Sequence, residues 1–183
     1  MAGCNEGANL GSHTLGRSGT VSAAVEATFF DLPAMAVSMY YPVERDIGLA
    51  DLDPDPALFE EARRVTRYLV DHAPGAGVFE QADYLNVNAP VPETVPGDGR
   101  PEMAITEPST VYMMDASQEE GRVTLHDRIW ERMGTGDVPD AEGTDRRAIV
   151  EGQISVSPLT APHTTEHHEA LDGLAETYPS SDE

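Results

Sequence analysis

Apolar residues in the first part of the chain recur at two different spacings. One set repeats every three or four positions and comprises Val21, Ala24, Val25 and Phe29. This is the spacing of one face of an α-helix, so it predicts a short helix over residues 19–30, with Ser18 or Thr20 as its N-cap. Residues 34–41 instead form a continuous apolar run after Pro33, which is typical of a buried strand.

The same two spacings continue to residue 91. Helical spacing returns in a set made up of Leu58, Ala62, Val65 and Leu69. It predicts a helix over residues 55–73, after a loop over residues 42–56. A second short strand is expected at residues 85–88. An order of helix, strand, helix and strand predicts an α/β fold with a parallel sheet and flanking helices.

The pattern changes after residue 91. The segments expected there are a Pro- and Gly-rich linker to residue 101, β-like segments over 103–114 and 122–131, an acidic turn region over 134–145, a strand over 148–157 and a helix over 165–177. The two β-like segments predict a β-hairpin that leaves the α/β body. The last strand and helix would then return to it.

Charge narrows the classes of partner. The 183 residues, enough for one domain with an excursion, include 33 acidic and 11 basic residues, all of the latter arginine, for a net charge of −22. Phosphate backbones and anionic membranes both require a basic patch, so we expect neither a nucleic-acid polymer nor a membrane as partner. The acidic residues alternate with apolar ones, which favours a folded protein with an acidic surface over a disordered tail.

An acidic surface of this kind is tolerated where salt screens its self-repulsion, so the composition predicts a halophilic protein. No apolar run approaches the ~20 residues that span a bilayer. Residues 1–16 lack the basic and then apolar pattern of a secretory signal, so a cytoplasmic location is expected. Cys4 is the single cysteine, which excludes an internal disulfide, and we expect it to be a packed structural thiol.

The chemistry-bearing residues cluster at the start of the chain. Residues 3–20 hold five glycines, and Gly3, Gly7, Asn9 and Gly11 are expected to shape a constrained loop. Asn5 offers a neutral oxygen that suits a hard divalent cation such as Mg²⁺, Mn²⁺ or Ca²⁺. Ser18, Gly19 and Thr20 open a helix, and a helix N-terminus suits a phosphate.

A cation beside a phosphate pocket is the arrangement used in metal-assisted phosphoester hydrolysis. The same residues also have a purely structural interpretation. Asn and Gly are the commonest turn formers, and Ser or Thr before a helix is ordinary capping. The spacing alone leaves both interpretations open.

Three landmarks in order resemble the SurE family of survival-protein nucleotidases and phosphatases. They are residues 3–11 with Ser18-Gly19-Thr20-Val21 and the strand Leu32–Ser38, then Leu85–Pro90, and finally Thr144-Asp145 with Gly152–Leu159. The resemblance covers nearly the whole chain. It implies a metal-dependent phosphomonoester hydrolase that acts on nucleoside monophosphates, as a 5'-nucleotidase.

The resemblance also implies site residues and a domain layout. The family holds its metal with an adjacent Asp pair, a loop Ser and the Asn that matches Asn5, and Ser18–Thr20 match its phosphate pocket. Its fold is a Rossmann-like core with a β-hairpin arm and a terminal helix that exchange between subunits of dimers or tetramers. Residues 1–91 would be the later portion of that core, 92–147 the arm and loops, and 148–183 the returning strand and terminal helix.

Two departures from the family pattern matter. The Asp pair has no match in this sequence, so the catalytic residues stay unknown. We expect a mis-called start or a real truncation, and a chain that is inactive alone. Arg17 stands where the family has Tyr before its Ser-Gly-Thr, which changes the pocket wall. The alternative is a non-catalytic remnant that acts only as an oligomerisation module.

Overall fold

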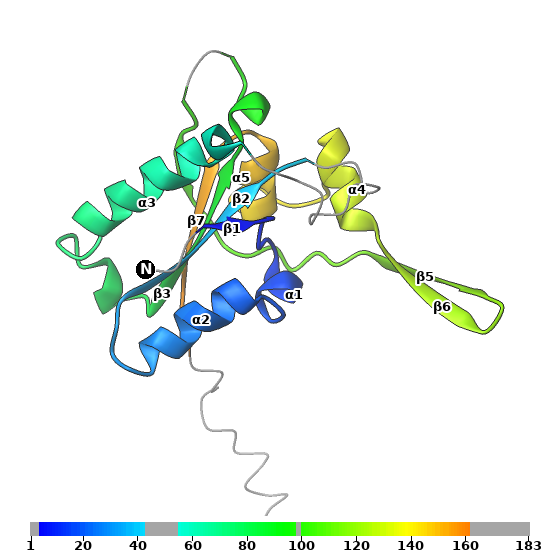
Figure 1. The fold of residues 1–183 in the computed structure, drawn as a ribbon, viewed down its shortest axis with the longest axis horizontal. Helices are drawn as coiled ribbons and strands as arrows, with labels where there is room; N and C mark the ends of the chain where they lie inside the picture. Colours follow the sequence, from blue (N-terminus) through cyan, green and yellow to red (C-terminus); the bar gives the residue numbers. More distant parts are fainter. Residues whose placement is uncertain (1–3, 43–54, 98–99, 162–183) are drawn as a thin grey trace, which may run out of the picture.

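The computed structural model describes residues 4–42, 55–97 and 100–161. A five-stranded sheet forms its centre, with helices on both faces, and a two-stranded arm projects from one side (Figure 1). No helix among these residues is long and apolar enough to cross a membrane. The predicted terminal helix over residues 165–177 lies outside the described residues, as does most of the predicted loop over 42–56.

The main sheet has the strand order β1-β2-β3-β7-β4. Its strands are β1 (Asn5–Glu6), β2 (Ala34–Tyr40), β3 (Tyr84–Pro90), β4 (Met103–Ile105) and β7 (Ile154–Leu159), and the arm consists of β5 (Met114–Glu119) and β6 (Arg122–Asp127). The helices are α1 (Ser12–Leu15), α2 (Gly19–Thr28), α3 (Glu60–His72), α4 (Arg128–Thr135) and α5 (Asp145–Val150), with short 3-10 turns at Pro56–Phe59, Val78–Glu80 and Pro92–Thr94.

The elements predicted in the first ninety residues are confirmed. Helix α2 begins after Ser18, whose Oγ accepts a hydrogen bond from the backbone N–H of Val21 at 3.1 Å. This bond satisfies one of the donors that a helix N-terminus leaves open. Strands β2 and β3 match the two predicted strands, and α3 matches the second helical spacing. The four-residue helix α1 was not predicted, because so short a segment carries no periodicity.

The direction of β7 differs from the parallel sheet expected from the sequence. Strand β3 pairs parallel with β2 but antiparallel with β7, and β4 pairs parallel with β7. A parallel neighbour requires a crossover connection, usually a helix, and the described residues between β3 and β4 form only the 3-10 turn Pro92–Thr94. The chain therefore turns back after β3, and the crossover through the arm, α4 and α5 makes β7 parallel to β4. The sheet is mostly parallel.

Three predicted strands in the second half have the wrong extent. Residues 103–114 form a strand only to Ile105, residues 122–131 become helical from Arg128, and residues 148–157 begin inside α5. Helix α4 is capped by Asp127, whose carboxylate accepts from the N–H of Ile129, and it buries Ile129 and Met133 four residues apart. Residues four positions apart lie on the same face of a helix, so the segment after the Asp127 cap is helical and not a strand.

Gly152 explains why residues 148–157 do not form one strand. Its φ is +77°, a conformation that L side chains rarely adopt. A Cβ there would lie 2.4 Å from Cδ of Pro96. Gly152 therefore lies just after the end of α5 and packs closely against the segment that follows β3. Strand β7 begins only after this glycine.

The two faces of the sheet differ in chemistry. On one face, apolar side chains of β2, β3 and β7 pack beneath α3; the buried members of this cluster are Val37, Ala62, Val65, Leu69, Ala73, Leu85, Val87, Ala89, Ile154 and Val156. On the other face, the centre of the same strands carries polar side chains, namely Ser38, Asn86, Asn88, Ser155 and Ser157, all fully buried. We call these the apolar face and the polar face.

Alternation along each strand produces this division. Leu85 and Val87 of β3 belong to the apolar face, and Asn86 and Asn88 between them belong to the polar face. The register carries the division across the sheet, because Ser38 stands opposite Asn88, and Asn88 opposite Ser155. The first strand continues this row with Asn5, which stands opposite Ser38.

Candidate active site

The glycine-rich loop lies over the polar face and is attached to it through Asn9. The backbone N–H of Asn9 donates to Asn88 Oδ1 at 2.8 Å, and its side-chain Nδ2 donates to Ser38 Oγ at 2.7 Å. The carbonyl of Asn9 accepts from Asn86 Nδ2 at 2.9 Å and from Asn88 Nδ2 at 3.1 Å. Four hydrogen bonds to buried partners fix this residue, as a loop-shaping role requires.

Asp145 attaches the far end of the loop to α5. Its Oδ2 accepts from the backbone N–H of Gly11 at 2.7 Å, and its Oδ1 accepts from the N–H groups of Ser109 at 3.0 Å and Arg146 at 2.8 Å. Burial raises the pKa of the Asp145 carboxyl, and the three N–H donors and the Arg146 charge partly offset that rise. One carboxylate therefore joins three segments.

Arg146 packs directly against Gly11. A Cβ at Gly11, whose φ is +77°, would lie 2.6 Å from Arg146 Nη2, so only glycine fits there. The guanidinium is buried and donates to the carbonyl of Val111. Its Nε lies 3.2 Å from Oδ1 of the buried Asp140, in an alignment that forms an ion pair without a hydrogen bond. The loop is thus held between charged groups that are themselves paired.

The sequence predicts a phosphate site at the N-terminus of α2, and the structure describes the backbone groups there. Ser18 Oγ is engaged in capping, which satisfies Val21. Among the described residues, no hydrogen bond uses the backbone N–H of Gly19 or of Thr20, and a Cβ at Gly19 would meet no atom within 4 Å. Two N–H groups without a described hydrogen-bond partner therefore stand at the positive end of the helix dipole, beside open space at Gly19.

The topology brings this helix end toward Asn5. Strands β1 and β2 pair in parallel, and α2 lies between them in sequence. A connection between parallel strands must run back antiparallel to them, so α2 begins near the carboxyl end of β1. No described hydrogen bond joins Asn5 to Ser18, Gly19 or Thr20, and their sharing one pocket stays a prediction.

Asn5 itself is half-buried on β1. Its Nδ2 donates to the carbonyl of Gly7 at 2.6 Å, and Gly7 has a φ of +93° in the turn that follows. The amide oxygen is the atom left for another partner. The predicted loop residue Gly3 lies outside the described residues.

The described residues do not complete a site for a divalent cation. Within 4–42, 55–97 and 100–161, no group of three or more His, Cys, Asp or Glu side chains could hold a metal ion. Hard cations draw most of their affinity from carboxylates, and Asn5 contributes one neutral oxygen. These residues therefore do not fit a cation by themselves.

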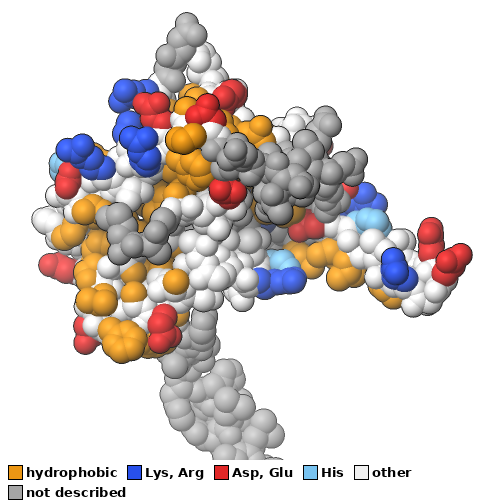
Figure 2. All heavy atoms as spheres, in the orientation of Figure 1, with side chains coloured by type: hydrophobic (Ala, Val, Ile, Leu, Met, Phe, Trp, Pro, Cys, Tyr) orange, Lys and Arg blue, Asp and Glu red, His pale blue; other side chains and the backbone are white. Residues whose placement is uncertain are grey.

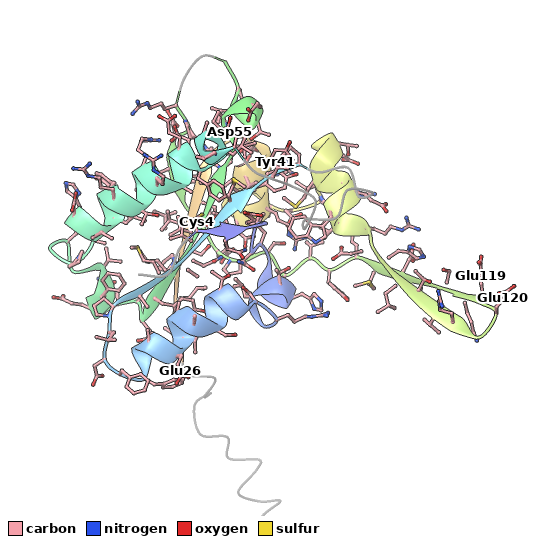
Figure 3. The ribbon with its side chains drawn as sticks, in the orientation of Figure 1. Cys4, Glu26, Tyr41, Asp55, Glu119 and Glu120 are labelled. Atoms are coloured by element: carbon pink, nitrogen blue, oxygen red, sulfur yellow. The ribbon has the colours of Figure 1, made fainter. Side chains whose placement is uncertain are left out.

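Cys4 lies on the other side of the sheet from Asn5. It packs, partly buried, against the apolar cluster beneath α3, and Figure 3 labels it beside β1. Burial, and then the nearby charge of Glu6, raise the pKa of the Cys4 thiol to about 11. A protonated thiol is neither a nucleophile nor a metal ligand, so the geometry agrees with the expected structural role.

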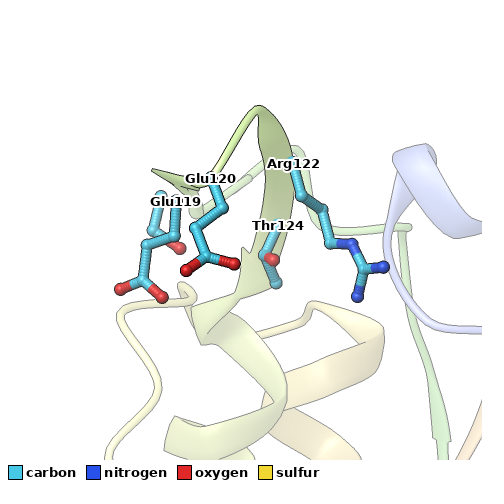
Figure 4. Close-up of a pocket in the computed structure, with 5 residues that line it drawn as sticks. Glu119, Glu120, Arg122 and Thr124 are labelled. Carbon is cyan, nitrogen blue, oxygen red and sulfur yellow. The ribbon is translucent and has the colours of Figure 1, made fainter.

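A recess of about 500 Å³ lies far from this chemistry, at the tip of the arm. Five side chains line it, namely Ser117, Glu119, Glu120, Arg122 and Thr124 (Figure 4). All five are exposed on a two-stranded ribbon that has no second layer behind it. Substrate sites are enclosed by packed walls, so this recess is not the candidate active site.

Sequence reasoning missed the residues that hold the loop in place. Asp145 entered only as part of a family landmark, and neither Arg146 nor Ser109 was singled out. A buried acidic residue next to a buried basic one looks like surface charge in the sequence. The signal that could have found Asp145 was its position beside Thr144 at the start of a helix, where a carboxylate can accept backbone N–H donors.

The fold and the loop define an α/β protein with a candidate phosphate site at a helix N-terminus. Comparison with known proteins makes this specific: residues 1–115 match the family model described as Survival protein SurE. The 5'-nucleotidase SurE of Haloarcula marismortui is 65% identical over 182 residues, with 100% of this chain and 66% of the relative covered. That of Natronomonas pharaonis is 61% identical, with 97% and 68% covered.

A solved structure agrees with the sequence matches. The crystal structure of the SurE protein from Aquifex aeolicus has a TM-score of 0.64 and 25% sequence identity, and the match covers 94% of this chain and 63% of that one. The chain belongs to the SurE family. It spans about two thirds of the length of the curated relatives that it matches.

Proposed function

We propose that this chain functions as a metal-dependent phosphomonoester hydrolase, a 5'-nucleotidase that acts on nucleoside monophosphates. The observation that carries the proposal is the N-terminus of α2, where no described hydrogen bond uses the N–H groups of Gly19 and Thr20 and the space beside Gly19 is open. Such donors bind phosphoryl oxygens, and they stabilise the charge that develops on them during hydrolysis. The relatives named 5'-nucleotidase SurE support the same reaction.

In this proposal, Ser18, Gly19 and Thr20 hold the phosphoryl group. The Ser18 hydroxyl oxygen accepts from Val21, which leaves its O–H proton free to donate outward. The loop attached through Asn9 and Gly11 fixes the position of α2 relative to the polar face. Asn9 therefore acts through the loop, and the hydrogen bonds of the polar face keep the donors in place before a ligand arrives.

The divalent ion, Mg²⁺, Mn²⁺ or Ca²⁺, would have Asn5 as one ligand through its amide oxygen. The described residues supply no carboxylate cluster, so its acidic ligands would come from outside them. We therefore expect the 183-residue chain by itself to release no phosphate. The chain joined to the third of the Haloarcula marismortui relative that it does not cover should do so, and EDTA should abolish the release.

The test measures phosphate release from AMP by both proteins, together with binding of inorganic phosphate to the 183-residue chain. In Gly19→Ala, the added methyl group fills open space in the first turn of α2, beside the proposed donors, so we expect phosphate binding to fall about tenfold or more. Gly134→Ala is the matched control, since that helical glycine also has no atom within 4 Å of a Cβ. Equal phosphate affinity in both variants would contradict the proposal.

Several haloarchaeal relatives support a protein that works in concentrated salt, and we propose that it does so in the cytoplasm. With a net charge of −22, self-repulsion should weaken the fold at low ionic strength. Thermal melts should therefore show a higher Tm in multimolar KCl than in dilute buffer. Equal melting temperatures would remove this part of the proposal.

The arm supports assembly into a homodimer or homotetramer, with a contribution from the predicted terminal helix. Strands β5 and β6 project from the body (Figure 1), and Val123 and Leu125 are 59% and 66% exposed. Exposed apolar side chains on a ribbon favour a protein partner. Sedimentation of Val123→Ser/Leu125→Ser should show smaller particles. Assembly without any phosphate binding would favour the rival function, a non-catalytic oligomerisation module.

A further inference from the structure

The segment around the phosphate donors is free of acidic residues. Residues 7–25 contain no Asp or Glu, although the chain has 33 acidic residues among 183. The two acids that bound this stretch are Glu6 and Glu26, and Figure 3 labels Glu26 on α2, beyond its first two turns. On a protein of net charge −22, none of the repulsion on an anion bound here comes from side chains of this stretch itself.

One arginine and one histidine, Arg17 and His13, stand within this stretch. Arg17 directly precedes Ser18, and its Nη1 lies 3.2 Å from Nε2 of His13 on α1. Because a guanidinium can only donate, Nε2 of His13 is the acceptor wherever the two groups form a hydrogen bond. Among the described residues, no carboxylate lies within 4 Å of the Arg17 guanidinium. Its charge is therefore available to an anion at the N-terminus of α2.

An aromatic ring from a distant segment completes the group. The rings of His13 and Tyr112 lie 4.2 Å apart between centroids, tilted by 42°. Tyr112 is 48% exposed, so one part of its ring meets His13 and another part meets solvent. Figure 2 shows histidine and arginine side chains beside hydrophobic ones where Figure 1 places α1.

Hydrogen bonds hold the two segments in this arrangement. The N–H of Ser12 donates to the carbonyl of Ser109 at 2.8 Å, and Asp145 accepts from both Gly11 and Ser109. The Arg146 guanidinium donates to the carbonyl of Val111, next to Tyr112. The ring pair is thus held before any ligand binds, which reduces the entropy lost on binding.

We propose that Tyr112, with His13 behind it, stacks against the base of a nucleoside monophosphate whose phosphate lies at Ser18–Thr20, and that Arg17 pairs with that phosphate. A flat ring with an exposed part suits a nucleobase, and a guanidinium suits a phosphate. Tyr112 would then select nucleotides over other phosphomonoesters, because Arg17 contacts only the phosphate that all of them share. This inference rests on the proposed phosphate site and adds the recognition of the nucleoside.

The test is calorimetric titration of the 183-residue chain in KCl with two probes, AMP and inorganic phosphate. In Tyr112→Leu, we expect AMP affinity to fall about tenfold while phosphate affinity is unchanged, because only the base loses its stacking partner. Tyr112→Phe should retain AMP affinity. Arg17→Gln should weaken both ligands. Tyr68→Leu is the matched control, since Tyr68 also stacks on a histidine, His72, at 4.4 Å and is 52% exposed on α3.

The outcomes separate this inference from the proposed function. Phosphate binding that is retained, with AMP affinity unchanged in Tyr112→Leu, overturns the stacking role alone. Loss of both ligands in Tyr112→Leu also overturns it, because the tyrosine would then support the fold and not the base. A wild-type chain that binds neither probe removes the phosphate site, and the nucleoside contact with it.

Discussion

The two faces of the main sheet are made by the same strands but hold the molecule together in different ways. Beneath α3, close-packed apolar side chains such as Leu85 and Val87 stabilise the fold through the hydrophobic effect, which does not depend on the orientation of the groups in contact. On the opposite face, Asn86 and Asn88 hold one particular loop residue, Asn9, through directed hydrogen bonds. Packing on the apolar face therefore supplies stability, and hydrogen bonding on the polar face fixes the position of the loop.

The polar face has a cost that the apolar face does not. Asn86 Oδ1 is buried and has no hydrogen-bond partner among the described residues. Burying an unpaired polar atom is unfavourable, so a sheet built for stability alone would place an apolar residue there. A network retained at such a cost is better explained by the loop that it fixes, which leads directly to the candidate phosphate site.

The largest effect is expected from Asp145→Ala. Removal of this carboxylate leaves the N–H groups of Gly11 and Ser109 unpaired and leaves Arg146 with one fewer buried counter-charge. Breaking such a buried pair typically costs about 3–5 kcal/mol. Urea unfolding of the variant measures this cost. A loss below about 1 kcal/mol would show that the polar face does not depend on this anchor.

A comparable loss from the apolar face is expected in Leu85→Ala. Leu85 is fully buried beneath α3, and truncating such a leucine typically costs about 3 kcal/mol through lost burial and the cavity left behind. Phosphate affinity at conditions where the protein stays folded should not change. A fall in affinity equal to that of a polar-face variant would break the distinction between the two faces.

Asn88→Ala should have a smaller effect on stability and a larger one on the loop. The change removes two hydrogen bonds to Asn9, which is worth about 1–3 kcal/mol for groups left unpaired. Hydrogen exchange at the Asn9 amide should accelerate more than exchange in α3. Uniform acceleration across both faces would mean that Asn88 contributes only to global stability.

The smallest effect is expected for Cys4, which precedes Asn5 in sequence and packs on the apolar face. Because its pKa is raised from 9.0 to about 11, its thiolate fraction near neutral pH, and hence its alkylation rate, should be roughly 100-fold below that of a free thiol. The raised pKa also determines how the contribution of Cys4 to the free energy of unfolding changes with pH. The contribution of Cys4 to stability is present below pH 9.0 and is lost as the pH rises through about 11.

Urea unfolding of wild type and Cys4→Ala across that pH window checks this pH dependence. The stability difference should move in favour of the variant as the pH rises. The opposite trend would place the thiol in a polar surrounding, against the assignment of Cys4 to the apolar face.

Local sequence determined the longer elements of the first ninety residues, α2, β2, α3 and β3. Ser18 caps α2 through a bond to a residue three positions away, and the alternation Leu85, Asn86, Val87, Asn88 already describes a strand with two unlike faces. Such features follow from short-range geometry, so periodicity and capping predict them. In the second half, α4 stands where a strand was expected, because apolar spacing over so few residues does not distinguish a helix from a strand.

Tertiary structure alone decided how the candidate site is held. Asp145 meets Gly11 across 134 positions of sequence, and Tyr112 meets His13 across a comparable gap. The direction of β7, which brings α5 onto the polar face, is likewise set by the path of the chain after β3. Sequence patterns record which face of its own element a residue prefers. Which distant element covers that face depends on how the whole chain packs, and no local spacing encodes it.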